Sequence, residues 1–222
     1  MSALGAILGK DLRVELRTLR SLPAMALFST AIFISFRFAL DRTSLQGDLA
    51  AGVLVTTILL AALLAVSRLF VSESEEGGFD LIRLAPVDRT ALFAAKAASL
   101  WIYLAALELV AVPLFALFFL DSAAGLVPLI AVLVLVNLGL AATGALISTI
   151  ATMSTARDLL APLIMLPLLI PLVIAASGAA EPLLDAGGPG YEHFGRWLAV
   201  LGLYDLVFLA VGYAVFDFLL ED

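Results

Sequence analysis

The stretch LVPLIAVLVLVNLGLAATGALISTIATM, residues 126–153, contains no charged side chain. The hydrocarbon core of a bilayer is about 30 Å thick, and a helix of about 20 apolar residues crosses it. The apolar residues of this stretch run on without alternating with polar ones, which favours a helix over the strand of a membrane β-barrel. Residues 126–153 therefore predict a transmembrane helix.

The rest of the chain has the same character. Of its 222 residues, 63% are hydrophobic and 14% are charged, which leaves too little polar surface for a water-soluble domain of this length. We therefore predict an all-α membrane protein with six transmembrane helices. The predicted helices cover Leu22–Leu40, Leu49–Ser67, Ala94–Leu120, Leu126–Met153, Leu159–Ser177 and Trp197–Leu220.

The composition also excludes several kinds of site. The chain has no cysteine, so disulfides, thiolate catalysis, cysteine-based zinc sites and covalent haem attachment through C-x-x-C-H are excluded. A net charge of −7 argues against a nucleic-acid partner, because binding phosphates requires clustered Lys and Arg. No group of His, Asp and Glu has metal-ligand spacing, so we predict no metal site and no intramembrane enzyme.

The basic residues predict the topology. Six spans place nine of them on one side of the membrane: Lys10, Arg13, Arg17, Arg20, Arg68, Arg83, Arg89, Lys96 and Arg157. Arg37, Arg42 and Arg196 fall on the other side. Because basic residues gather in cytoplasmic segments, we expect both termini to lie in the cytoplasm.

Residues 1–21 predict an amphipathic helix at the membrane surface, ahead of the six-helix domain of residues 22–222. Apolar residues recur at helical spacing from Leu4 to Leu19, and the opposite face is basic. We expect this helix to lie flat on the inner leaflet, with its basic side chains near anionic lipid headgroups. These side chains are Lys10, Arg13, Arg17 and Arg20. The alternative is a soluble leader that packs on another part of the protein.

The longest polar segment is RLFVSESEEGGFDLIRLAPVDRTALFAAK, residues 68–96. Gly77 and Gly78 would end a helix, Pro86 would break the next apolar run, and Asp88 would cap the helix that enters the membrane. This pattern predicts short ordered pieces below the membrane. One interpretation is a docking surface for a cytoplasmic protein, and the other is an ordinary ordered loop.

At these residues the chain resembles a known family. An acidic stretch followed by GGFDLIRLAPVDRTALFAAK after the second span is similar to the cytoplasmic loop of ABC-2 type transporter permeases. Three stretches together resemble the haem exporter protein B family of the cytochrome c maturation system. They are KDLRVELRTLR near the start, SRLFVSESEEGGFDLIRLAP after the second span, and APLIMLPLLIPLVI in the fifth span.

The resemblance implies an ABC-2 type permease architecture without an ATPase site of its own, and the chain has no G-x-x-x-x-G-K-[ST] phosphate loop. ATP would be hydrolysed by a separate cytoplasmic subunit similar to haem exporter A. That subunit would push on loop 68–96, and the coupling residues would be Glu73, Glu75, Glu76, Gly77, Gly78, Asp80, Arg83 and Pro86.

The resemblance also implies partners and a location. The partners would be other membrane subunits of the cytochrome c maturation complex, membrane lipids and a second copy of the chain, and the location would be the bacterial inner membrane. Haem would be either transported or held by a partner, and no cofactor is assigned to the chain. Two alternatives remain: a general ABC-2 permease for another substrate, and a membrane scaffold that transmits ATP energy to a haem-handling partner without carrying substrate.

Two carboxylates lie inside predicted spans. Glu108 lies 12 residues beyond Lys96, about 18 Å along a helix, and Asp205 lies 8 residues after Trp197, about 12 Å along a helix. A carboxylate costs about 2.5–3.5 kcal/mol at the centre of a membrane helix, so each should be protonated, paired or facing a cavity. Each is either a polar site at a subunit or transport interface, or a structural carboxyl.

Three further features are less specific. Pro162, Pro167 and Pro171 predict either a flexible or broken fifth span or a static kink. His193, the only histidine, is either a haem ligand or, as is commoner, an interfacial surface residue in an aromatic cluster. Gly139, Thr143 and Gly144 would allow close helix contact.

Overall fold

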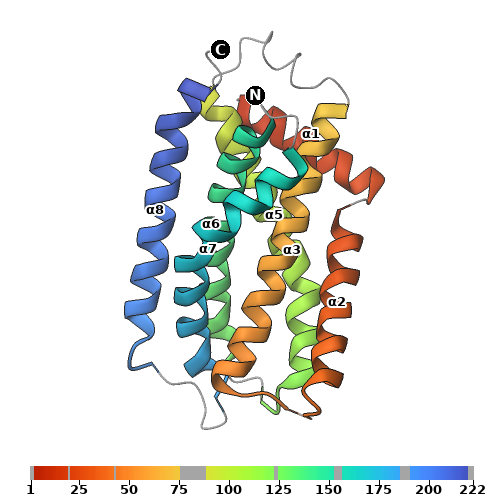
Figure 1. Ribbon diagram of the computed structural model, residues 1–222, viewed down its shortest axis with the longest axis vertical. Helices are drawn as coiled ribbons and strands as arrows, with labels where there is room; N and C mark the ends of the chain where they lie inside the picture. Colours follow the sequence, from red (N-terminus) through yellow and green to blue (C-terminus); the bar gives the residue numbers. More distant parts are fainter. Residues whose placement is uncertain are drawn as a thin grey trace.

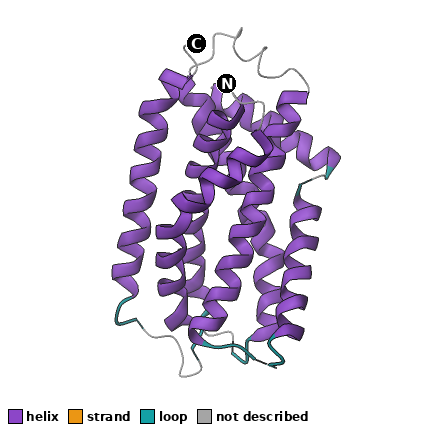
Figure 2. Cartoon of the chain, in the orientation of Figure 1, coloured by secondary structure: helices purple, strands orange, loops and turns teal. Residues whose placement is uncertain are grey.

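The computed structural model describes residues 3–19, 21–42, 44–75, 89–122, 125–152, 157–185 and 191–219. Every regular element in these ranges is a helix (Figure 2). The elements are α1 (Ala3–Thr18), α2 (Leu22–Ala39), α3 (Gly47–Glu75), α5 (Arg89–Phe119), α6 (Leu126–Thr152), α7 (Arg157–Ala180), the 3-10 helix η1 (Glu181–Leu183) and α8 (Phe194–Leu219). The prediction of an all-α protein is confirmed.

Six of the helices are long and apolar enough to cross a bilayer, from α2 to α8. They run up and down as a bundle, with α1 lying across one end (Figure 1). We call this end the α1 end and the other the η1 end. The last turn of α8 lies at the α1 end (Figure 1). The C-terminal end of α8 is therefore on the same side as α1, as six crossings require.

The centre of the bundle is formed by α3 and α6. In these two helices 61% and 56% of the apolar span is buried, against 17% in α2 and 22% in α8. Helix α6 packs on α3, α5, α7 and α8, whereas α2 packs on α3 and α5. Helices α2 and α8 therefore form opposite edges, with most of their surface turned outward (Figure 1).

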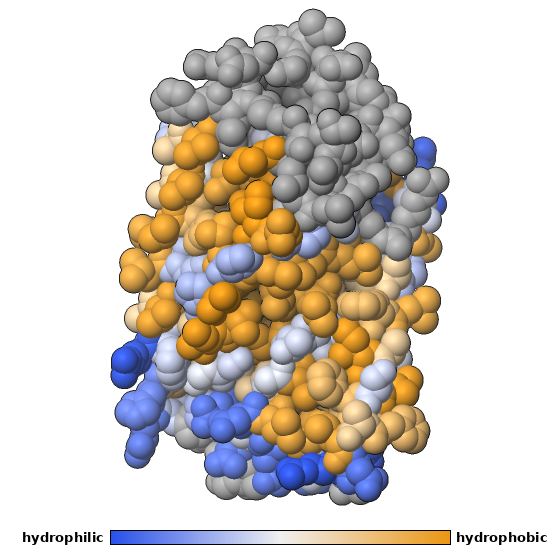
Figure 3. Space-filling model, in the orientation of Figure 1, coloured by the Kyte–Doolittle hydropathy of each residue, from blue (hydrophilic) through white to orange (hydrophobic). Residues whose placement is uncertain are grey.

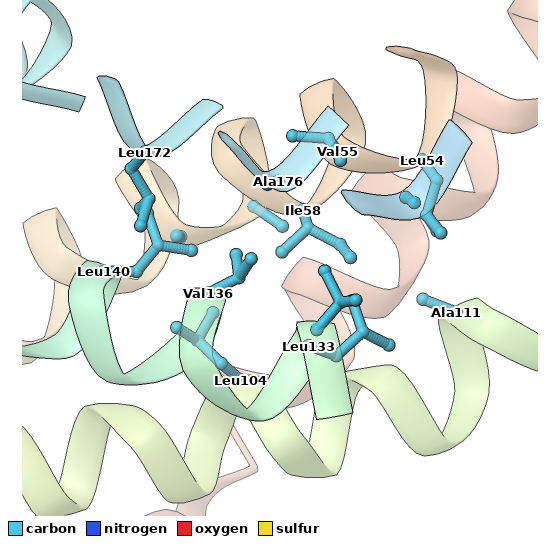
Figure 4. Close-up of a cluster of buried hydrophobic side chains, with 14 of the residues drawn as sticks. Leu54, Val55, Ile58, Leu104, Ala111, Leu133, Val136, Leu140, Leu172 and Ala176 are labelled. Carbon is cyan, nitrogen blue, oxygen red and sulfur yellow. The ribbon is translucent and has the colours of Figure 1, made fainter. Parts of the chain in front are cut away.

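Aliphatic side chains fill the middle of the bundle. Leu54 and Ile58 of α3, Leu104 of α5, Leu140 of α6 and Leu172 of α7 are almost completely buried and lie in one cluster (Figure 4). Outward-facing positions are also apolar, as the broad hydrophobic band across the molecule shows (Figure 3). Apolar residues on both faces suit a protein whose solvent is lipid.

Hydrogen bonds between the connections hold the η1 end together. Arg37 at the end of α2 donates 2.9 Å hydrogen bonds to the carbonyl oxygens of Arg42 and Phe118. The amide of Leu45 donates to the carbonyl of Phe119 at 2.8 Å, and that of Gly47 to the carbonyl of Leu184 at 3.1 Å. Two of these acceptors, Phe118 and Phe119, are terminal carbonyls of α5 that lack a partner within the helix.

Helix α7 is continuous from Arg157 to Ala180 although it contains three prolines. Of the two interpretations of this span, a broken helix is therefore wrong. Each proline removes one backbone donor, which leaves one carbonyl of the preceding turn without its partner in the helix. Neighbouring helices must supply donors for these carbonyls. The carbonyl of Leu168, between Pro167 and Pro171, accepts a 3.2 Å hydrogen bond from the hydroxyl of Tyr204 of α8.

Candidate functional site

The predicted coupling segment joins α3 to α5 at the α1 end of the bundle. Glu73 and Glu75 lie in the last turn of α3, which continues past the predicted end of the second span. Helix α5 begins at Arg89. The other predicted coupling residues, Glu76, Gly77, Gly78, Asp80, Arg83 and Pro86, lie outside the described residues. The structure therefore describes the two helices that this segment connects.

A buried ion pair joins α1 to α5 close to this segment. The Nζ atom of Lys96 lies 2.9 Å from Oδ2 of Asp11, and the two side chains are 3% and 6% exposed. Ser99 donates to the same carboxylate oxygen at 3.2 Å. The hydroxyl of Tyr103 donates to the backbone carbonyl of Asp11 at 3.1 Å. One residue of α1 thus bonds to three side chains on one face of α5.

The spacing of these residues explains why they can meet. Positions 96, 99 and 103 are separated by three and four residues, which places their side chains in one row along a helix. Lys96 lies seven residues after the first residue of α5, about 10 Å along its axis. The ion pair therefore connects α1 to α5 at the last residue of loop 68–96, within two turns of the start of α5.

A second acidic residue connects α1 to α2. Oε1 of Glu15 accepts the backbone N–H of Ser21 at 2.8 Å and that of Leu22 at 2.9 Å. These amides belong to the N-terminus of α2, where backbone donors have no partner within the helix and where negative charge is favoured. Leu19 has a φ of 45° and turns the chain between the two helices. Glu15 therefore fixes the corner at which the chain enters the first span.

The face of α1 that packs on the bundle carries acidic side chains. Leu16 and Leu19, two residues of the predicted apolar face, are turned away from the bundle and are 71% and 56% exposed. The most buried side chains are Asp11 and Glu15, with Leu8 and Leu12 half-buried beside them. Of the two interpretations of residues 1–21, the packing of α1 on α5 supports a helix anchored to the protein. Contact with lipid remains a prediction.

The predicted basic face of α1 points away from the bundle. Lys10, Arg13 and Arg17 are exposed, and they line an open groove of about 280 Å³ together with Gly5, Ala6, Gly9 and Val14. Arg20, the fourth predicted basic residue, lies outside the described residues. Three of the four basic side chains are therefore exposed on the side of α1 that faces away from the bundle, where they can contact anionic lipid headgroups.

The intramembrane carboxylates lie at one level of the bundle. Glu108 of α5, Asn137 of α6 and Asp205 of α8 each lie about three turns, or about 16 Å, from the η1 end of their helix. Asn137 donates a 2.9 Å hydrogen bond to Oε2 of Glu108. Oε1 of Glu108 and Oδ1 of Asn137 have no partner among the described residues. The level therefore holds one hydrogen-bonded carboxyl group, at Glu108, and a second carboxyl group at Asp205.

Asp205 lies on the other side of α6, close to Gly139. Its side chain is 3% exposed, and neither carboxylate oxygen has a hydrogen-bond partner among the described residues. Beside it, the hydroxyls of Thr143 and Tyr204 share a 2.9 Å hydrogen bond. The expectation that Gly139 and Thr143 allow close helix contact is confirmed, because both contact side chains of α8.

His193 lies just before α8 and is exposed. Its carbonyl oxygen accepts the amides of Arg196 at 3.1 Å and Trp197 at 3.2 Å. The ring of Tyr191 packs edge-on against that of Phe194 with centroids 5.8 Å apart. These two rings of the predicted aromatic cluster therefore pack together at the start of α8. Within the described ranges, no three His, Asp or Glu side chains come together in a way that could hold a metal ion.

The sequence did not reveal that Lys96 pairs with Asp11, nor that Glu15 accepts the first amides of α2. Lys96 was recognised as a basic residue at the base of the third span, and Asp11 lies 85 residues before it. The available signal was the presence of two acidic residues on the apolar side of the predicted amphipathic helix. Acidic side chains at such positions indicate partners in the protein, because an unpaired buried charge is costly.

Comparisons with known proteins identify the family of this chain. The sequence model of the family described as CcmB protein matches residues 2–218. The chain is 30% identical over 215 residues to heme exporter protein B of Bradyrhizobium diazoefficiens, covering 96% of this chain and 94% of that protein.

Two further relatives have the same name. Heme exporter protein B of Pseudomonas aeruginosa is 29% identical over 197 residues, covering 88% of this chain and 87% of the relative. That of Rhodobacter capsulatus is 29% identical over 170 residues, covering 76% and 78%. The family model spans α1 and the six membrane-spanning helices, and the chain belongs to the CcmB protein family.

Proposed function

We propose that this chain is the membrane permease subunit of an ABC-type complex that serves haem export in cytochrome c biogenesis. The observation that carries the proposal is the family match over residues 2–218, which includes all six helices able to span a membrane. Three relatives named heme exporter protein B support it. The same family assignment disfavours a general ABC-2 permease for another substrate.

In this proposal the chain does not hydrolyse ATP. Its sequence has no G-x-x-x-x-G-K-[ST] phosphate loop, so hydrolysis would take place in a separate cytoplasmic ATPase subunit. The α1 end would then face the cytoplasm and the protein would lie in the bacterial inner membrane. Other membrane subunits of the maturation complex and a second copy of the chain are the remaining proposed partners.

Force from the ATPase would enter between α3 and α5. A push on the segment after Glu75 reaches the first turns of α5, and the Lys96–Asp11 pair couples that movement to α1. Glu15 then couples α1 to the start of α2. Such rigid contacts favour movement of packed helices as bodies over local bending. Helices α1, α2 and α5 would therefore move together.

A second candidate function is a scaffold that carries no substrate. The middle of the bundle is filled with buried aliphatic side chains from α3, α5, α6 and α7 (Figure 4). A haem that crossed the membrane would therefore pass at the boundary between this chain and a neighbour. The packed centre favours both a path between subunits and a scaffold that moves a haem-handling partner.

The coupling proposal can be tested with matched charge removals. One variant combines Glu75→Gln, Glu76→Gln and Asp80→Asn at the predicted coupling segment. The control combines Asp121→Asn, Asp185→Asn and Glu192→Gln, three exposed acidic residues at the η1 end. We expect the first variant to lose co-purification of the ATPase and holocytochrome c, and the control to keep both. Normal ATPase binding and normal cytochrome c in the first variant would contradict the proposed coupling site.

Reconstitution separates the permease from the scaffold. Vesicles that contain the chain and its ATPase would be supplied with haem and ATP, with and without the haem-handling membrane partner. Haem movement without the partner supports the permease, and movement only with the partner supports the scaffold.

A further inference from the structure

The side chain of Asp205 is buried inside the membrane-spanning bundle, where no described residue bonds to its carboxylate group. It is 3% exposed, and both carboxylate oxygens lack a hydrogen-bond partner among the described residues. It lies about three turns from the first residue of α8, about 16 Å along the axis. This depth is close to the middle of a hydrocarbon core that is about 30 Å thick.

The wall opposite Asp205 is shaped to admit its carboxyl group. A Cβ atom added at Gly139 of α6 would lie 2.7 Å from Oδ1 of Asp205 and 2.7 Å from Cδ1 of Leu172. Both distances are shorter than a van der Waals contact, so a side chain at Gly139 would displace the side chains of Asp205 and Leu172 or move the helices that carry them. The carboxyl group therefore occupies the space that glycine leaves in α6.

The neighbouring polar groups are directed elsewhere. The hydroxyl of Tyr204 donates to the carbonyl of Leu168 and shares a hydrogen bond with Thr143. The amide of Asn137 donates to Glu108 of α5, the other carboxyl at this level.

The charged groups of the helices packed on α8 also lie away from Asp205. Helix α6 contains no charged residue, and the charged residues of α7 are confined to its first turn, at the α1 end. Lys96 of α5 is paired with Asp11. On α8 itself, Arg196 lies nine residues nearer the η1 end and Asp217 lies near the α1 end. No described basic side chain forms an ion pair with Asp205.

An ionised carboxylate cannot remain unpaired in such surroundings at low cost. A buried charge without a partner costs several kcal/mol or changes its protonation state, and a carboxylate at the centre of a membrane helix costs about 2.5–3.5 kcal/mol. A bound proton removes the charge and fits the space without further atoms. The chemistry of the site therefore selects a proton as its ligand.

We propose that Asp205 is a proton-binding site that is occupied while α6 and α8 are packed together at Gly139 and releases its proton when the two helices separate. On separation, water enters between the helices, the O–H bond of the carboxyl breaks, the proton passes to water and the negative charge stays on the carboxylate. Helix α8 lies at the edge of the bundle, with 22% of its span buried, so it can move away from α6 at a lower packing cost than a central helix. This site does not depend on the haem-export function.

The occupied state can be tested by infrared difference spectroscopy on the full chain in lipid nanodiscs. At neutral pH we expect the wild type to show the C=O stretch of a protonated carboxylic acid that Asp205→Asn lacks. Glu108→Gln assigns any band that belongs to the other carboxyl group. A difference spectrum that shows Asp205 ionised at neutral pH would overturn the proposal.

The dependence on helix packing is tested at Gly139. Gly139→Leu forces α6 and α8 apart, so we expect the pH at which the Asp205 band is half lost to fall by about one unit or more. Gly202→Leu is the matched control on α8, because a Cβ atom there meets nothing within 4 Å, and we expect no change. If Gly139→Leu does not fold, Gly139→Ala replaces it, with a smaller shift in the same direction. An unchanged midpoint in the folded Gly139 variant would overturn the proposed release.

Discussion

The ammonium nitrogen of Lys96 lies 2.9 Å from a carboxylate oxygen of Asp11, and this contact joins two helices whose residues are 85 positions apart in the chain. Both side chains are almost completely buried. Since α5 is the helix that follows the predicted coupling segment, the ion pair makes α1 part of the structure that would receive force there. We therefore expect the stability of the bundle and the proposed coupling to depend on contacts at the α1 end.

Loss of Lys96 is expected to be strongly destabilising. Lys96→Met leaves the carboxylate of Asp11 without its buried cation, and removal of one partner of a buried ion pair costs about 3–5 kcal/mol. We expect a lower melting temperature, followed in detergent by the fluorescence of Trp101 and Trp197. Lys10→Met is the control, because the Lys10 side chain is 53% exposed and lies 3.8 Å from the same carboxylate. Equal melting temperatures for the two variants would contradict this role of Lys96.

Loss of Glu15 is expected to loosen the start of α2. Glu15→Ala removes the acceptor of two backbone amides, and a hydrogen bond to a charged group contributes about 1.5–3 kcal/mol. The amides of Ser21 and Leu22 should therefore exchange with deuterium about tenfold faster or more. Thr18→Ala on the same turn of α1, an exposed residue that bonds to the Val14 carbonyl, should leave their exchange unchanged. If these amides stay as protected as in the wild type, the Glu15 carboxylate does not stabilise the start of α2.

Glu108→Gln is expected to keep the fold and to alter the function of the complex. In the wild type Asn137 donates a 2.9 Å hydrogen bond to Glu108. The amide oxygen of glutamine can still accept this bond, but glutamine cannot carry the negative charge. We expect an unchanged melting temperature and reduced cytochrome c production in a strain that carries only the variant. Normal cytochrome c production would leave Glu108 as a structural carboxyl.

The topology can be measured directly because the chain has no cysteine. Ala6 of α1 and Glu192 before α8 are both exposed and lie at opposite ends of the bundle. Since basic residues gather on the cytoplasmic side, a thiol reagent that cannot cross the membrane should label Glu192→Cys in intact cells. It should label Ala6→Cys only after the cells are opened. Labelling of Ala6→Cys in intact cells would place the α1 end outside and would contradict the inward-facing coupling segment.

The sequence by itself determined the number and positions of the membrane helices. The predicted span Leu126–Met153 corresponds to α6 at Leu126–Thr152, and Leu22–Leu40 corresponds to α2 at Leu22–Ala39. Such runs can be recognised locally, because the cost of placing a helix in lipid is close to a sum over its own residues. The predicted boundaries differ most at the α1 end. There α3 continues past Ser67 to Glu75, and α5 begins at Arg89 instead of Ala94, because a helix can extend beyond the bilayer into water.

Only the tertiary structure decided which polar groups meet. Asp11 is paired with Lys96, Glu15 with the amides of α2, Asn137 with Glu108, and Asp205 with no described side chain. No local pattern contains this information, because the state of a buried polar group depends on which helices become its neighbours. The apolar runs place six helices in the membrane, and the packing of α1, α5, α6 and α8 then determines whether a given carboxylate pairs with a cation, accepts a hydrogen bond from an amide or, as proposed for Asp205, binds a proton.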